Sequence, residues 1–196
     1  SYSTGNISGT WSAGGIAGDV HASGSIANSY STGNVNGICA GGIAGFVEYG
    51  GSITNSYSTG NISGESVGGI AGGVNDGVII TNCAAANGRI TGGVLDRDDC
   101  YTGHRILGNG GVSGLSNNFA NSDMTIQPPM VSCARDSSSN GIDKPLEELK
   151  TRSTYENAVD DGSGGLGWKF GDDDSNPWKI DAGKNNGFPY LYWQEF

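Results

Sequence analysis

The sequence is poor in charged residues, above all in basic ones. Only 15% of its 196 residues are charged, against about 25% in typical domains. Ten basic residues stand against 20 acidic ones, and the formal net charge is −10. A nucleic-acid binder needs clustered lysine and arginine to neutralise phosphates, and so does a protein that binds anionic lipid. The composition therefore argues against nucleic acid and anionic membrane surfaces as partners.

Long apolar runs and catalytic motifs are lacking as well. No segment approaches the roughly 18 consecutive apolar residues of a transmembrane helix, so we expect no membrane insertion. The two histidines, His21 and His104, do not stand in the H-E-x-x-H phrase of zinc peptidases. The few acidic residues of the first 80 positions do not recur as a pair of carboxylates, which glycoside hydrolysis needs. We therefore expect no enzymatic activity.

Glycine is abundant, with 36 residues, and it recurs at fixed positions beside isoleucine, valine and tyrosine. The phrase G-G-I-A-G occurs three times, with its isoleucine 27 residues apart at Ile16, Ile43 and Ile70. A disordered linker has no reason to keep apolar residues in register. The same repeat aligns four further columns: Val20, Val47 and Val74; Ile26, Ile53 and Ile80; Asn28, Asn55 and Asn82; and Tyr2, Tyr30 and Tyr57.

The repeat blurs after residue 80 but continues. The step from Ile80 to Leu115 is 35 residues, so about eight have been inserted, around positions 94–103. We count four to five turns, ending near Ile126. In the last turn Ile106 takes the place of Ile70, Asn117 that of Asn82, Phe119 that of the tyrosine and Met124 that of Ile62.

The spacing within a turn is that of β-strands. Ile26, Asn28 and Tyr30 alternate with Ala27 and Ser29, which predicts that the first three share one face and the small residues face outward. Short strands with a fixed period and no helical stripe predict a mainly β fold, a right-handed parallel β-solenoid whose coils stack roughly 4.8 Å apart. The G-G-I-A-G glycines would let one wall of a thin coil approach another. The asparagine column forms either an amide ladder or a cap on each turn.

These phrases resemble the GLUG-motif family, whose repeats are built on "GGIAG…I.NSYSTGNV.G". The resemblance covers Ser1 to about Ile126 and extends to "WKIDAGKNNGFPYLYW" (Trp178 to Trp193), which is similar to the ends of GLUG proteins of gut Bacteroidetes. The family occurs in secreted and surface proteins of bacteria, including adhesin-like proteins and the non-catalytic parts of some immunoglobulin A peptidases. The resemblance implies an extracellular β-solenoid and carries no established catalytic residues.

Residues 127–196 differ in composition from the repeat domain, 1–126. We expect a small α+β cap that covers the open end of the solenoid. It would contain one helix, from Asp143 to Ala158, and three strands, at 166–170, 177–181 and 188–193. Trp168, Trp178 and Trp193 are either part of the core of this cap or an aromatic platform that binds a glycan.

Two further sites rest on residue type. If a metal binds, calcium at Asp172, Asp173 and Asp174 is the first choice, because Ca²⁺ takes carboxylate oxygens, although the calcium motifs are missing and solvated loops are the alternative. Four cysteines are present. Cys39 and Cys83 occupy different columns, whereas Cys100 and Cys133 lie in irregular segments and could form a disulfide outside the cell, with free thiols the alternative.

The sequence therefore predicts a non-catalytic, adhesin-like module of a secreted or cell-surface bacterial protein, forming the end of a longer chain. A host surface protein or a glycan is the expected partner, and we expect a monomer without a required cofactor. The alternative is an accessory repeat region of a larger secreted hydrolase, an immunoglobulin A peptidase or a glycan-degrading enzyme.

Overall fold

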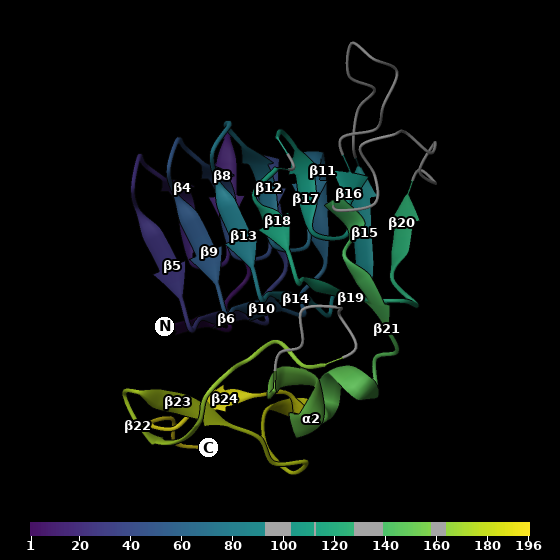
Figure 1. Cartoon of the computed structure of the whole chain (residues 1–196). Coiled ribbons are helices and arrows are strands. Elements are labelled where there is room, and N and C mark those ends of the chain that lie inside the picture. Colours follow the sequence, from purple (N-terminus) through teal and green to yellow (C-terminus); the bar gives the residue numbers. More distant parts are fainter. Residues whose placement is uncertain (93–102, 112, 128–138, 158–163) are drawn as a thin grey trace.

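The chain folds into a parallel β-solenoid with a smaller unit packed along its side (Figure 1). The computed structural model describes residues 1–92, 103–111, 113–127, 139–157 and 164–196. The solenoid has about four turns and ends at Lys144. We call residues 145–157 and 164–196 the C-terminal unit. The predicted mainly β, solenoidal fold is confirmed.

Successive turns add parallel strands to four sheets. The first, which we call the tyrosine sheet, contains β1 (Tyr2–Ser3), β6 (Tyr30–Ser31), β10 (Tyr57–Ser58), β14 (Ala84–Ala85), β19 (Phe119–Asn121) and β21 (Ile142–Lys144). The second contains β2 (Ile7–Ser8), β3 (Ser12–Gly14), β7 (Val35–Gly41), β11 (Ile62–Gly68), β15 (Arg89–Gly92), β16 (Gly103–His104) and β20 (Thr125–Gln127). The third contains β4 (Ala17–Val20), β8 (Ala44–Val47), β12 (Ala71–Val74) and β17 (Leu107–Asn109). The fourth contains β5 (Ser25–Ala27), β9 (Ser52–Thr54), β13 (Ile79–Thr81) and β18 (Leu115–Ser116).

The strands pair in the register of the repeat. Tyr30 lies between Tyr2 and Tyr57, and Ile80 pairs with Leu115 across the longer turn. Phe119 takes the tyrosine position, opposite Ala84, as the sequence predicts.

One assignment in the last turn is wrong. Ile126, not Met124, pairs with Ile90 and continues the column of Ile62. The backbone N–H of Met124 instead donates to the carbonyl of Asn121, a local turn that adds two residues before β20.

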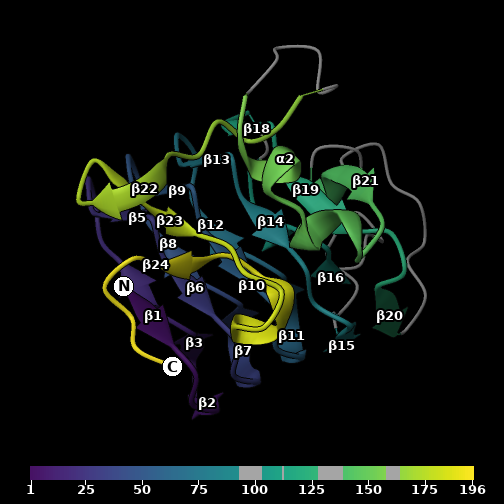
Figure 2. The ribbon, with the colours of Figure 1, turned by 90° about the horizontal axis from the view of Figure 1, so that it is seen from below.

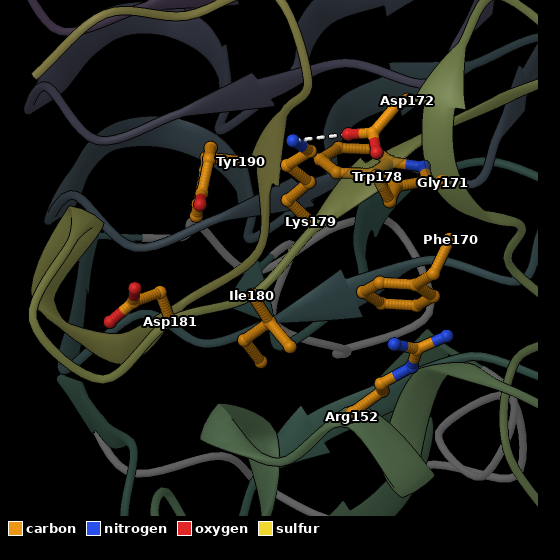
Figure 3. Close-up of a pocket in the computed structure, with 9 residues that line it drawn as sticks. All are labelled: Arg152, Phe170, Gly171, Asp172, Trp178, Lys179, Ile180, Asp181 and Tyr190. Atoms are coloured by element: carbon orange, nitrogen blue, oxygen red, sulfur yellow. Dashed lines mark ion pairs between the residues drawn. The ribbon is translucent and has the colours of Figure 1, made fainter.

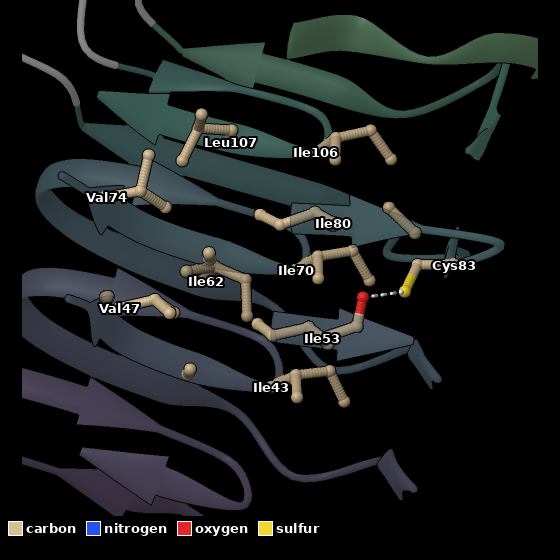
Figure 4. Close-up of a cluster of buried hydrophobic side chains, with 14 of the residues drawn as sticks. Ile43, Val47, Ile53, Ile62, Ile70, Val74, Ile80, Cys83, Ile106 and Leu107 are labelled. Atoms are coloured by element: carbon tan, nitrogen blue, oxygen red, sulfur yellow. Dashed lines mark hydrogen bonds between the residues drawn. The ribbon is translucent and has the colours of Figure 1, made fainter. Parts of the chain in front are cut away.

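Like side chains stack on like inside the solenoid. Ile43, Ile70 and Ile106 are fully buried and lie in one column, and Val47 and Val74 lie in another (Figure 4). Their backbones are joined coil to coil, because the N–H of Ile43 donates to the carbonyl of Ile70, and that of Ile70 to Ile106. One coil alone could not bury these residues, so stacking supplies the hydrophobic stabilisation.

The G-G-I-A-G glycines allow two walls of the coil to touch, as predicted. A Cβ atom on Gly42 would overlap the carbonyl oxygen of Gly69 and the side chain of Ser58. Gly15 stands in the same relation to Ser31 and Gly42. The solenoid is therefore too thin at this point for any side chain larger than hydrogen.

Each asparagine of the column lies in a turn of the backbone. The prediction that Ile26, Asn28 and Tyr30 share one face is therefore wrong. Asn28, Asn55, Asn82 and Asn117 all have φ between 47° and 56°, a left-handed conformation that asparagine tolerates. The chain reverses its alternation there, so Ile26 points into the solenoid while Tyr30 points out. Ser29, predicted to face outward, is buried, and so is Ser56 at the same position of the next turn. An amide ladder is present at one step, where Asn117 Nδ2 donates to Asn82 Oδ1 at 2.7 Å.

The C-terminal unit is mostly irregular, with short helices and an antiparallel sheet. It contains η1 (Glu148–Lys150), α2 (Arg152–Tyr155), β22 (Phe170–Asp173), β23 (Asn176–Lys179), η2 (Asn185–Gly187) and β24 (Tyr190–Leu191). The single predicted helix is broken, because Thr151 is extended at φ −108° and ψ 142°. The residues just before Pro145 extend the solenoid as β21, since proline disfavours helical geometry in the residue before it. The solenoid thus runs past Ile126, the predicted boundary.

The sequence predicted that the C-terminal unit covers the open end of the solenoid, and this prediction is wrong. It runs back along the tyrosine sheet, so that both chain ends lie near each other (Figures 1 and 2). Trp168 Nε1 donates to the carbonyl of Asn82 at 2.8 Å, and Trp178 Nε1 donates to Asn28 Oδ1 at 3.3 Å. At the first turn, Trp193 contacts Tyr2. The unit therefore spans several turns from the side.

Candidate functional site

The tyrosine sheet and the C-terminal unit bury a second hydrophobic core between them. The rings of Tyr2, Tyr30 and Tyr57 stack along the solenoid axis, with centroids 5.5 and 5.0 Å apart. Trp168 and Trp178 lie against this ladder, 2% and 0% exposed, with their own centroids 4.4 Å apart. These two tryptophans are therefore core residues and cannot form a surface platform.

Hydrogen bonds fix the ladder to the end of the chain. Tyr57 donates its hydroxyl proton to the carbonyl of Pro189 and accepts from Asn185 Nδ2, both at 2.6 Å. Gln194 Nε2 donates to the hydroxyl of Tyr30 at 2.6 Å. A buried hydroxyl without a hydrogen-bond partner destabilises the folded state. These bonds therefore favour one docking geometry, which apolar contacts alone would not specify.

Because the phenols of Tyr57 and Tyr155 are buried, we expect the protein to lose stability at alkaline pH. Burial raises the pKa of Tyr57 well above its ordinary value of 10.0, and burial also raises the pKa of Tyr155. The folded state thus favours the neutral phenol, so its stabilisation is complete below pH ~10 and declines as pH rises further. We expect the urea midpoint to fall between pH ~8 and pH ~11, with tyrosinate absorbance appearing on unfolding. Replacing the exposed Tyr49 with phenylalanine should not change this fall, and equal midpoints at both pH values would contradict the prediction.

Trp193 is the one predicted aromatic site residue that remains at the surface. It is 51% exposed, and its ring centroid lies 5.5 Å from that of Tyr2, which is 44% exposed. The three tryptophans predicted to act together thus separate into a buried pair and an exposed residue.

The three aspartates proposed for calcium do not converge. Asp172 pairs with Lys179, Asp173 accepts from the backbone N–H groups of Ser175 and Asn176, and Asp174 accepts from the hydroxyl of Tyr192. The hydrogen bond from the Asn176 side-chain amide lowers the pKa of Asp173. Asp173 therefore stays ionised, and its carboxylate stabilises the turn. Nowhere in the described residues do three His, Cys, Asp or Glu side chains meet as a metal site requires.

The cysteines give no reactive centre in the described part of the chain. Cys39 and Cys83 are free thiols, and burial raises the pKa of Cys83 to about 12. A thiol with so high a pKa is a poor nucleophile at neutral pH. The proposed partners Cys100 and Cys133 both lie outside the described residues.

A shallow groove of about 240 Å³ opens on the C-terminal unit (Figure 3). Sequence reasoning missed it because its walls come from separate segments: Arg152 of α2, Phe170 to Asp172 of β22, Trp178 to Asp181 at the end of β23, and Tyr190 of β24. The signal that could have indicated it is the distribution of basic residues. None lies in residues 1–88, whereas all five lysines lie between Lys144 and Lys184.

The groove mixes apolar surface with charges of both signs. The guanidinium of Arg152 lies 4.9 Å from the ring centroid of Phe170, and one of its nitrogens donates to Glu156 at 2.6 Å. Lys179 forms an ion pair with Asp172, which raises the pKa of the lysine. This arrangement can bind a polar ligand but contains no activated nucleophile or acid–base pair among its described lining residues.

No helix in the described ranges has the length and apolar character to cross a bilayer. Residues 36–63, one full turn from β7 into β11, match the family model of the GLUG motif. No curated protein matches the chain.

The fold is similar to the crystal structure of a candidate immunoglobulin A1 protease from Bacteroides ovatus, with a TM-score of 0.66 and 28% sequence identity. The match covers 99% of this chain and 57% of that one, so the chain spans little more than half the length of its relative. The chain thus carries the GLUG motif in its second turn and shares its fold with the Bacteroides ovatus protein along nearly its whole length.

Proposed function

We propose that the chain is a non-catalytic β-solenoid module that acts outside the cell, presents an adhesin-like contact surface and works as a monomer. GLUG repeats and the Bacteroides ovatus relative support an extracellular setting. The observation that carries the proposal is the position of the C-terminal unit. Its buried aromatic residues attach it to the side of a rigid solenoid, while its groove and Trp193 face solvent.

Such a design separates two tasks. The stacked coils provide a stiff support whose inward-facing side chains are committed to packing. The C-terminal unit carries the polar and aromatic groups that can recognise a host surface protein or a glycan. A binding site on a rigid element loses less conformational freedom on association than a site on a mobile loop.

Binding to host epithelial cells tests this function. The purified chain should bind to the cells saturably, and an Arg152→Ala, Trp193→Ala double variant should bind at least about tenfold more weakly. The matched control is Asp19→Asn, which changes an exposed carboxylate on the solenoid. Absence of saturable binding, or equal binding by both variants, would contradict an adhesin-like surface on this unit.

A second candidate is an accessory region of a larger secreted hydrolase. The observation in its favour is the similarity to the candidate immunoglobulin A1 protease, whose chain is longer than this one. An accessory module should bind the substrate of its enzyme, so surface plasmon resonance with immobilised human immunoglobulin A1 would detect it. Binding to immunoglobulin A1 but not to cells would favour this candidate over the first.

A further inference from the structure

We propose that the groove between Arg152 and Tyr190 binds one sugar ring of an uncharged glycan. This inference rests on the proposed binding function and deepens it, because it names the site and the class of ligand.

The charges in the groove favour a neutral ligand. Arg152 and Lys179 contribute two positive charges, and Asp172 and Asp181 contribute two negative ones. An anion would approach two carboxylates, and a cation would approach an ammonium and a guanidinium, so either would meet repulsion that offsets its attraction. Sugar hydroxyls carry no charge and can both donate and accept, which suits a groove with both kinds of partner.

The polar groups retain capacity for such hydrogen bonds. Within the described residues Arg152 uses one nitrogen for Glu156, while a guanidinium has five N–H donors. Asp181 accepts from the backbone N–H of Gly183 at 2.8 Å through one oxygen, Oδ1. Figure 3 shows Arg152 and Asp181 on opposite sides of Ile180. A ring placed over Ile180 therefore has a donor on one side and an acceptor on the other.

The apolar part of the groove and its size fit a single ring. Phe170 and Ile180 are half-buried and offer surface to the C–H face of a sugar. A volume of about 240 Å³ is below the roughly 300–1,000 Å³ of sites for drug-sized ligands. The groove therefore suits one terminal residue of a glycan better than a long oligosaccharide.

The walls are held in place before any ligand arrives. Trp178, at the base of the groove, is fully buried against Trp168 and Tyr57. Asp173 closes the β22–β23 turn through bonds of 2.8 and 3.0 Å to backbone N–H groups. A preformed site spends less binding free energy on ordering itself, which matters for a ligand as small as one sugar.

Protein-observed NMR tests the inference with methyl glycosides of glucose, galactose, mannose and N-acetylglucosamine as probes. At least one should shift the amide signals of Ile180 and Asp181 with a Kd in the ~1 mM range. Arg152→Ala and Asp181→Asn should each raise that Kd at least about tenfold, because each removes a charge-assisted hydrogen bond. Asp19→Asn on the solenoid is the control and should leave the Kd unchanged.

Charged probes decide between neutral and ionic recognition. N-acetylneuraminic acid and glucosamine should bind more weakly than the neutral glycosides, and tighter binding of either would overturn the inference. So would the absence of any shift at ~50 mM probe. If sugars bind but only Trp193→Ala weakens them, the groove is the wrong site while the proposed binding function stands. If the groove variants lose sugar binding and cell binding is unchanged, the glycan site stands and the adhesin-like role fails.

Discussion

Replacing Trp178 with alanine is expected to lower the free energy of unfolding by about 3–5 kcal/mol. The side chain is 0% exposed and contacts Trp168, Tyr30 and Tyr57, with ring centroids 4.4 to 6.4 Å away. Its removal leaves a large cavity between the tyrosine sheet and the C-terminal unit, and it deletes the bond to Asn28. Since domains are stable by only about 5–15 kcal/mol, the loss would be a large share of the total.

Urea unfolding followed by far-UV circular dichroism measures this effect without relying on tryptophan fluorescence. Trp193→Ala is the matched control, because Trp193 is 51% exposed and should cost less than about 1 kcal/mol. If both variants lose the same stability, the C-terminal unit is not anchored through its buried tryptophans.

Replacing Gly42 with valine is expected to prevent the solenoid from forming. A Cβ atom there would overlap the backbone of Gly69 in the next turn and the side chain of Ser58 across the coil. Overpacking a core costs about 1–3 kcal/mol when side chains can move aside. Here the obstacle includes a main-chain carbonyl held in the stack, so the loss should exceed ~3 kcal/mol.

Thermal melts and the dispersion of backbone NMR signals report the outcome. Gly5→Ala is the control, because a Cβ at Gly5 meets nothing within 4 Å, and it should stay within about 0.5 kcal/mol of the parent chain. A cooperative melt of the Gly42 variant near the parent temperature would show that the coil is wider than the structure indicates.

The repeat made much of the solenoid predictable. A fixed period of 27 residues aligns Ile16, Ile43 and Ile70, and stacking of identical coils is the way to bury such columns. The prediction survived the longer turn, where Leu115 and Phe119 stand in their expected columns. It failed at Met124, because a local turn shifts the register by two residues and only hydrogen bonding reveals it.

Local alternation in the sequence could not predict the direction in which the tyrosine side chains point. Alternation predicts that Ile26 and Tyr30 share a face, but the left-handed φ of Asn28 places them on opposite sides of the wall. Asparagine allows this geometry without requiring it. An outward tyrosine column is stable only if something covers it, and that cover begins at Pro145, more than 100 residues after Tyr30.

The sequence by itself determined the stacked coils, the columns of isoleucine and valine, and the glycines where two walls meet. Each of these follows from neighbours at a constant spacing, so a repeat encodes them directly. Only the tertiary structure decided that the C-terminal unit lies along the side of the solenoid, buries Trp168 and Trp178, and assembles a groove from Arg152, Asp172 and Asp181. Those contacts join residues that occur once and lie far apart in the chain, and no periodicity records which of them will meet.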